Sequence, residues 1–255
     1  MIKLSVVIIT FNEEKNIERC IRSLKGISDE VIVVDSFSTD ATEKICIDLG
    51  AKFFKHAFAG YIEQKNYAAT LTSFDHILSV DADEVVSDRL RDSILAVKKD
   101  WKHSSYSMNR LSNYCGHWIK HGGWYPDRKT RLFEKGKGKW GGYNPHDKYL
   151  PENPNDSELL KGDLLHYSYY SIEGHIAQVN KFSGIGAHSA FIAGKRSNYF
   201  KIIFKPAFKF FRDYILRAGF LDGYYGYVIS RISSHETFLK YVKLREMQKS
   251  SGEAS

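Results

Sequence analysis

The sequence predicts an α/β fold built on a mainly parallel sheet with helices on both faces. Short apolar runs suited to buried strands alternate with segments of helical periodicity through the first hundred residues. Polar loops follow three of these strands. The composition, 43% hydrophobic and 26% charged over 255 residues, excludes collagen-like and wholly disordered classes and leaves room for one large domain with an extension.

The elements of residues 1–100 follow one another in a regular order. Residues 4–9 are a continuous apolar run, typical of a strand buried on both faces. Asn12 can cap a helix whose apolar residues recur at helical spacing from Ile17 to Leu24. Ser87 is expected to cap a later helix. Between them we expect a strand at 31–34, a helix at 39–49, a strand at 52–55, a helix at 61–71 and a strand at 77–80.

In a parallel sheet, ligands bind beyond the carboxyl ends of the strands. The polar loops 10–13, 35–40 and 81–84 lie at those ends. The loop Asp81-Ala82-Asp83-Glu84 offers carboxylates, which suit a hard divalent cation that also bridges to substrate phosphates. A solvated acidic turn is the alternative. Asp35, which ends the second strand, can accept hydrogen bonds from a base or ribose, or brace its own turn.

Other site classes find no support in the sequence. Neither the dinucleotide-binding pattern GxGxxG after the first strand nor the P-loop pattern occurs. The three cysteines form no CxxC pair, so we expect reduced thiols without a zinc site or disulfides. The N-terminus lacks signal-peptide features, and no apolar run approaches the roughly 18 residues of a membrane span.

Four motifs occur in order at the predicted strand ends and on the helix at 61–71: Thr10-Phe11-Asn12-Glu13, the loop 35–40, Lys65-Asn66 and Asp81-Ala82-Asp83. Together they resemble the family 2 glycosyltransferases of the GT-A fold, which is Rossmann-like. Downstream, GGWYPDRKTRLF, His146-Asp147 and the C-terminal segment resemble the bacterial subgroup that includes lipopolysaccharide inner-core β-glucosyltransferases. The likeness covers nearly the whole chain.

The resemblance implies a set of nucleotide-sugar-binding residues. Asp35 would contact a uracil-type base, and Asp81 the ribose or a metal-bound water. Lys65 would approach the pyrophosphate, although it could also be a surface lysine of its helix. The nucleotide pocket would be lined by Thr10, Asn12 and Glu13.

The resemblance also implies a metal and a catalytic acid. Asp83 and His166 would hold Mn²⁺ or Mg²⁺. Asp147 would be the base that takes the proton of the attacking hydroxyl, because a sugar hydroxyl is a poor nucleophile at neutral pH. Asp127 in Tyr-Pro-Asp is the competing candidate, since a histidine precedes Asp147 where the family usually has an acid.

Three residues of the Gly-rich and aromatic stretch are candidates for binding the acceptor. Trp124 and Tyr125 sit among glycines, where flat rings can stack on sugars, or can simply pack a β-rich half-domain. Arg131 can hold an anionic group through two parallel hydrogen bonds, or can anchor a loop.

The resemblance therefore implies an inverting hexosyltransferase that moves glucose or another hexose from a UDP-sugar to a lipid-linked glycan such as the lipopolysaccharide core. We expect a GT-A domain at 1–170, with a nucleotide-sugar half at 1–100 and an acceptor half at 101–170. A helical extension at 171–249 and a disordered tail at 250–255 would follow. A sugar-phosphate nucleotidyltransferase and a non-catalytic sugar-nucleotide or membrane-binding module are the alternatives.

The C-terminal segment carries the excess of positive charge. Lys and Arg total 37 against 30 Asp and Glu, and residues 195–255, with 12 basic and 5 acidic residues, account for the whole +7. Residues 199–216 interleave aromatics with Lys and Arg, and Pro206 must begin or kink a helix. Such a helix can lie on an anionic membrane surface or cover the protein's own core. A nucleic-acid partner would not explain the strand-end carboxylates. We therefore expect the anionic partner to be a membrane surface, with the protein cytoplasmic and bound to the inner membrane face through residues 199–249.

Overall fold

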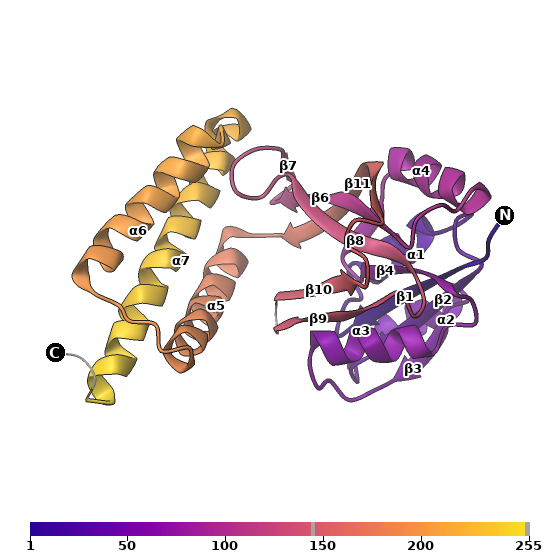
Figure 1. Cartoon of the computed structure of the whole chain (residues 1–255), viewed down its shortest axis with the longest axis horizontal. Coiled ribbons are helices and arrows are strands. Elements are labelled where there is room, and N and C mark those ends of the chain that lie inside the picture. Colours follow the sequence, from indigo (N-terminus) through magenta and orange to yellow (C-terminus); the bar gives the residue numbers. More distant parts are fainter. Residues whose placement is uncertain (144–145, 253–255) are drawn as a thin grey trace. The chain divides into compact units, whose positions relative to one another are not determined.

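The computed structural model describes residues 1–143 and 146–252 (Figure 1). The chain divides into two compact units. Unit 1 comprises Met1–Arg110 and Asp127–His166, and unit 2 comprises Leu111–Pro126 and Tyr167–Ser255. Residues 111–126, expected in the catalytic domain, therefore belong to unit 2. Of the tail expected to be disordered, residues 253–255 lie outside the described residues, and Ser250 is the last residue of a helix.

The main sheet has the strand order β3-β2-β1-β4-β8-β6-β11-β5, with β7 paired to β6. The first four strands are parallel to one another, whereas β8 is antiparallel to β4 and β6, and β5 is antiparallel to β11. The parallel core confirms the predicted α/β class. The strands are β1 Leu4–Thr10, β2 Glu30–Asp35, β3 Lys52–Lys55, β4 His76–Asp81, β5 Glu84–Val86, β6 Ser105–Tyr114, β7 His117–Ile119, β8 Asp127–Glu134 and β11 Ser157–Tyr169.

Helices cover both faces of the parallel strands because successive side chains of a strand point to opposite faces. Leu4, Val6 and Ile8 of β1 pack with α1, α2 and α4 in one buried cluster. Val7 of the same strand packs with Ala68 of α3 in another. The four helices are α1 Ile17–Ser23, α2 Thr42–Asp48, α3 Tyr61–Thr70 and α4 Asp88–Lys99.

Two predicted helix caps have different outcomes. Ser87 caps α4 as predicted, since its Oγ accepts a hydrogen bond from the Leu90 N–H at 3.4 Å. The predicted cap at Asn12 is wrong, because α1 begins only at Ile17. Asn12 instead adopts a left-handed backbone (φ 53°), and its Oδ1 accepts a hydrogen bond from the Thr39 N–H at 2.8 Å. The side chain is thus used to join two loops.

A two-stranded sheet packs beside the parallel strands of unit 1. It consists of β9 Gly138–Tyr143 and β10 His146–Pro151, paired antiparallel. Tyr149 stacks on Phe133 of β8 with ring centroids 3.9 Å apart. A Cβ at Gly138 would lie 2.5 Å from the Leu150 carbonyl oxygen, so only glycine allows this close pairing. The hairpin is therefore anchored to the main sheet by aromatic packing.

Unit 2 contains the predicted C-terminal helical extension. Helix α7 Gly223–Ser250 packs along both α5 Ile172–Ile192 and α6 Tyr199–Phe211. A π-helical turn, η1 Arg212–Leu216, and a 3-10 turn, η2 Gly219–Asp222, join α6 to α7. In the described part of the chain, none of the helices combines the length and the hydropathy that a membrane span requires.

A buried histidine lies in the aromatic core of unit 2. His175 of α5 is 3% exposed, its Nδ1 lies 3.0 Å from the Tyr114 hydroxyl, and its ring packs on Tyr169. Burial lowers the pKa of His175 from 6.5 to about 4. As the pH falls, His175 therefore takes up a proton near pH 6.5 in the unfolded chain but only near pH 4 in the folded chain.

We predict that the free energy of unfolding falls by ~1 kcal/mol per pH unit between pH 6 and 4.5 through this histidine. The variant His175→Gln should show a flatter dependence over that window, measured by urea unfolding. His188→Gln, at an exposed position of the same helix, is the control and should follow the parent protein. Equal pH slopes for the parent and His175→Gln would contradict the prediction.

Candidate active site

The carboxyl ends of β1, β2 and β4 meet at one edge of the sheet. Thr10 pairs in register with Asp35, and Ile9 pairs with Asp81. The structure therefore brings the three polar loops of the sequence together. This juxtaposition follows from parallel pairing, which aligns the ends of neighbouring strands.

Hydrogen bonds join the loop after β1 to the loop after β2. The Asn12 N–H donates to Ser38 Oγ and the Glu13 N–H to Thr42 Oγ1, each at 2.8 Å. Asp35 is fully buried, and its carboxylate accepts hydrogen bonds from the N–H and the hydroxyl of Ser38. Asp35 thus braces the second loop, and its contact to a base stays a prediction.

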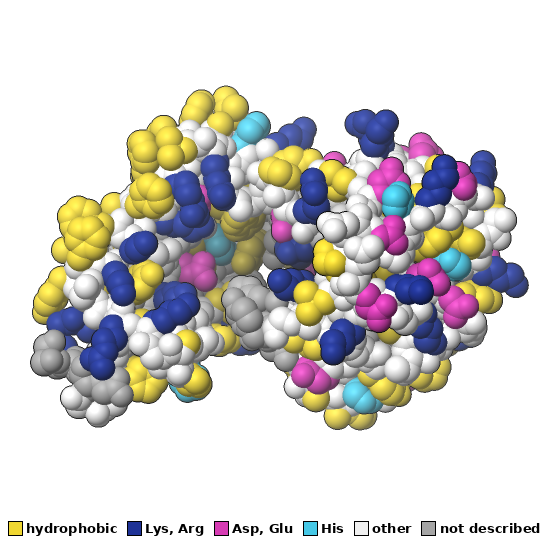
Figure 2. Space-filling model, in the orientation of Figure 1, with side chains coloured by type: hydrophobic (Ala, Val, Ile, Leu, Met, Phe, Trp, Pro, Cys, Tyr) yellow, Lys and Arg dark blue, Asp and Glu magenta, His cyan; other side chains and the backbone are white. Residues whose placement is uncertain are grey.

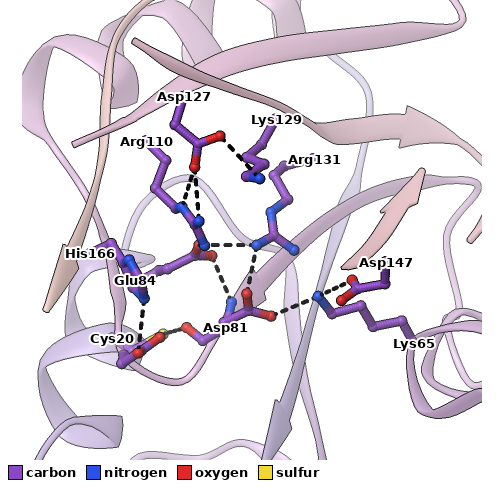
Figure 3. A network of polar contacts seen from close by, with 11 residues as sticks. Cys20, Lys65, Asp81, Glu84, Arg110, Asp127, Lys129, Arg131, Asp147 and His166 are labelled. Atoms are coloured by element: carbon purple, nitrogen blue, oxygen red, sulfur yellow. Dashed lines mark hydrogen bonds and ion pairs between the residues drawn. The ribbon is translucent and has the colours of Figure 1, made fainter. Parts of the chain in front are cut away.

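The acidic residue Asp81 is at the centre of a network of alternating charges (Figure 3). Its Oδ2 accepts a hydrogen bond from Arg131 Nη2 at 2.6 Å, and its Oδ1 lies 3.0 Å from Lys65 Nζ. Burial alone would raise the pKa of Asp81, but the two cations hold it well below the ordinary carboxyl value. Asp81 is therefore ionised throughout the physiological range.

Glu84 completes the network, whereas the sequence indicates it only as one of the carboxylates of the acidic loop 81–84. Its side chain is fully buried, its Oε2 accepts the Asp81 N–H at 2.8 Å, and its Oε1 accepts Arg131 Nη2 at 3.0 Å. Arg110 Nη1 lies 3.6 Å from the same Oε1. Glu84 thus braces the turn that carries Asp81 and Asp83. A signal was present, since a third acid directly follows the pair.

Arg131 lies inside this network. The residue is 3% exposed, and its guanidinium lies over the Trp140 ring, 5.5 Å from the ring centroid. Although burial disfavours its charge, Asp81 and Glu84 raise the pKa of Arg131. The sequence predicts that Arg131 contacts the acceptor, but in this structure its guanidinium has almost no exposed surface. Arg131 instead orients the two carboxylates.

Lys65 bridges Asp81 to Asp147. Its ammonium lies 2.8 Å from Asp147 Oδ2 and 4.5 Å from the Trp140 ring centroid, and the residue is 3% exposed. Next to it, Asn66 makes two hydrogen bonds to the Trp140 backbone, at 3.1 and 3.0 Å. Helix α3 thereby holds the β9–β10 hairpin and fixes the position of Asp147. The alternative of a surface lysine is wrong.

Asp127, the competing candidate base, is held by two cations. Arg110 donates to its Oδ2 at 2.9 Å through Nε and approaches it at 2.8 Å through Nη2, while Lys129 Nζ lies 3.1 Å from its Oδ1. Both carboxylate oxygens of Asp127 are therefore ion-paired. In Asp147, by comparison, Oδ2 is the oxygen that pairs with Lys65.

Asp83 and His166 form the candidate metal-binding pair. His166 Nε2 lies 3.1 Å from Asp83 Oδ2, because His166 of β11 stands in register opposite Glu84 of β5. Burial, with repulsion from Asp83 and Asp40, raises the pKa of nearby Glu13. Among the described residues, no group of three or more His, Cys, Asp or Glu side chains is arranged to hold a metal. The protein thus offers a carboxylate and an imidazole, and a cation would need further ligands from its substrate.

The two aromatic acceptor candidates belong to unit 2. Trp124 packs against Tyr114, Tyr169 and His175 with ring centroids 5.5–5.7 Å apart. Its ring thus contributes to the core of that unit. Contact of Trp124 and Tyr125 with an acceptor stays a prediction.

Comparisons with known proteins identify the family of this chain. A family model described as glycosyl transferase family 2 matches residues 5–153. A protein of Rickettsia bellii (strain RML369-C), named an uncharacterized glycosyltransferase, is 35% identical over 96% of this chain and 87% of its own length. The chain therefore belongs to glycosyl transferase family 2, and it is a glycosyltransferase, as the resemblance implied.

One relative has a more specific name. The lipopolysaccharide core biosynthesis glycosyltransferase LpsC of Rhizobium meliloti (strain 1021) is 30% identical over 94% of this chain and 91% of its own length. A crystal structure of glucosyl-3-phosphoglycerate synthase from Mycobacterium tuberculosis covers 44% of this chain and 44% of its own, with 26% identity and a TM-score of 0.37. Family membership decides for glycosyl transfer over the nucleotidyltransferase and the non-catalytic module.

The network predicts a large cost for removing the buried charge of Glu84. Glu84→Gln leaves Arg131 and Arg110 without their shared carboxylate, so the free energy of unfolding should fall by about 3–5 kcal/mol in urea titrations. Glu18→Gln breaks an exposed pair with Arg22 and should cost less than about 1 kcal/mol. Similar small losses for both variants would contradict the structural role of Glu84.

Proposed function

We propose that this enzyme is a metal-dependent, inverting hexosyltransferase that uses a UDP-sugar, with glucose as the first candidate hexose. The acceptor is a hydroxyl of a lipid-linked glycan such as the lipopolysaccharide core. Family membership and the LpsC relative support the reaction class and the type of acceptor. The observation that carries the proposal is the pairing of Asp147 and Asp81 through Lys65, which sets a candidate base beside the strand-end loops.

Asp147 acts as the general base in this proposal. The acceptor oxygen attacks the anomeric carbon while its proton passes to the Asp147 carboxylate. The bond between the anomeric carbon and the diphosphate oxygen breaks, and its electron pair leaves with UDP. A single in-line displacement inverts the configuration, so a UDP-α-sugar yields a β-linked product. Asp127 is the weaker candidate because cations pair with both of its oxygens.

The strand-end loops bind the donor in this proposal. Thr10, Asn12 and Glu13 line the nucleotide pocket, and Asp35 recognises the base. The Thr10 Oγ1 is buried without a hydrogen-bond partner among the described residues, which supports a polar ligand or water there. Lys65 and Arg131 keep Asp81 ionised beside the ribose and diphosphate.

Asp83 and His166 would hold Mn²⁺ or Mg²⁺. The donor set fits, since one carboxylate and one imidazole lie 3.1 Å apart and Mg²⁺ commonly takes its remaining ligands from phosphates and water. When bound, the cation would offset the negative charge of the leaving diphosphate. Peripheral association with the inner face of the cytoplasmic membrane, through residues 199–249, belongs to the same proposal.

The reaction is tested with a panel of nucleotide sugars, with and without a lipid-linked glycan acceptor. We expect UDP from a UDP-hexose, in an amount that rises with acceptor, and no pyrophosphate.

Asp147→Asn should lower kcat by about 10²–10⁴-fold with little change in the KM for the donor. Asp127→Asn, the matched control, should lower kcat less than tenfold. The reverse order of the two variants would make Asp127 the base, and release of pyrophosphate would overturn the proposal.

The metal assignment predicts a separate effect. Asp83→Asn removes a ligand charge, so the Mn²⁺ concentration for half-maximal UDP release should rise more than about tenfold. Asp88→Asn changes an exposed acid on α4 and should leave that concentration unchanged. Retention of the parent's Mn²⁺ dependence in Asp83→Asn would refute the assignment.

A further inference from the structure

Unit 2 exposes a long row of aromatic and aliphatic side chains, here called the apolar arc. It runs from α6 through η1 and η2 to the start of α7. Every member is 45–66% exposed, although soluble proteins rarely leave so many large apolar side chains together in water. The members are Tyr199, Phe200, Ile203, Phe204, Phe208, Phe211, Ile215, Leu216, Phe220, Leu221, Tyr224 and Tyr227.

The spacing of the arc residues explains their common exposure. Phe200, Phe204, Phe208 and Phe211 recur every three or four residues, so they share one face of α6. The opposite face carries the buried Pro206, whose carbonyl accepts a hydrogen bond from Ser234 of α7 at 2.8 Å. The aromatic face of α6 is thus turned away from α7, and among the described residues of unit 2 it covers no core.

Cations flank the arc on α6. Lys201, Lys205 and Arg212 stand four and seven residues apart, which aligns them along one edge of the aromatic face. Figure 2 shows hydrophobic side chains at the left of the view, where Figure 1 labels α6, with Lys and Arg side chains beside them. This combination of aromatic face and basic edge is typical of helices that lie in a membrane interface.

A second group of cations converges at the end of α6. Lys209 Nζ lies 2.6 Å, Arg212 Nε 2.8 Å and Arg217 Nη1 3.8 Å from the carboxylate of Asp213. Asp213 is 3% exposed, whereas the side chains of the three cations are 30–50% exposed. One buried carboxylate therefore gathers three accessible cations and leaves a net positive cluster beside the arc.

The carboxylate of Asp213 is held rigidly. A Cβ at Gly123 would lie 3.0 Å from its Oδ2, so the glycine lets the carboxylate approach the chain. The Gly122 N–H donates to the Arg217 carbonyl at 2.9 Å. The cluster is thus organised before any ligand arrives, which lowers the entropic cost of binding an anion.

We propose that the apolar arc inserts into the headgroup region of an anionic bilayer and that Lys209, Arg212 and Arg217 bind the phosphates of its lipids. The inference deepens the proposed function and rests on it for the choice of a membrane that carries the acceptor. A second copy of the chain fits less well, because a two-fold contact through the arc would bring two positive clusters into one interface. Charge complementarity favours the bilayer.

The test is sedimentation of the full chain with vesicles of phosphatidylcholine alone or mixed with phosphatidylglycerol. The parent should bind the anionic vesicles at least about tenfold more tightly. Arg212→Gln with Arg217→Gln should weaken that binding roughly 25-fold, about fivefold per charge, and leave binding to phosphatidylcholine unchanged. Lys44→Gln, at an exposed position of α2 in unit 1, is the charge control and should bind like the parent.

The arc is tested in parallel with two separate double variants. Phe204→Ser with Phe208→Ser on α6, and Phe220→Ser with Leu221→Ser on η2, should each weaken binding at least about tenfold. Ile47→Ser, an exposed apolar residue of α2, is the control. Two double variants on different elements keep the test decisive if one of them fails to fold.

Parent-like vesicle binding by folded arc variants would overturn the proposal. So would a dimer, seen by sedimentation velocity, that the arc substitutions dissociate. UDP release with a lipid-free acceptor tests the proposed reaction independently of vesicle binding. Loss of vesicle binding with UDP release intact supports the surface, whereas vesicle binding without any UDP release refutes the proposed function and leaves the surface standing.

Discussion

The ion pairs that Arg131 makes with Asp81 and with the buried Glu84 are the interaction on which the active site depends. A buried charge without a partner costs several kcal/mol, whereas alternating charges satisfy one another. Asp81 meets two cations, and Glu84 meets Arg131 and Arg110. The network joins β4, β5, β6, β8 and α3, so it fixes the turn after β4 relative to the rest of unit 1.

This network also explains how the site can hold many acids close together. Asp81, Asp127 and Asp147 each pair with at least one Lys or Arg. Asp83 instead faces the imidazole of His166. The cation proposed at Asp83 would meet an imidazole there, and among the described residues no ion pair joins Asp83 to a Lys or Arg. In the proposed reaction, the acids that pair with Lys or Arg serve in positioning and proton transfer.

Charge is used differently in unit 2. The excess of +7 comes from residues 195–255, and five of the cations in this segment lie on α6 and η1 or directly after them, namely Lys201, Lys205, Lys209, Arg212 and Arg217. In the site of unit 1, the buried cations Lys65 and Arg131 pair with carboxylates inside the fold. In unit 2 a single buried carboxylate, Asp213, gathers three cations that stay accessible. Lys, Arg and Asp side chains thus build a site in one unit and a basic surface in the other.

The sequence by itself determined the strands, the helices and the edge where the polar loops meet, because hydrophobic periodicity and parallel pairing are local and regular. Its resemblance to a known family also indicated Asp81, Asp83, Lys65 and Asp147, and the structure joins Asp81 to Asp147 through Lys65. Only the tertiary structure decided that Glu84 and Arg110 brace that site, that Arg131 is buried, and that the aromatic face of α6 is exposed. Which charges pair and which faces are covered depends on contacts between residues far apart in the sequence, such as Lys65 and Asp147, 82 positions apart. Local sequence patterns do not predict such contacts.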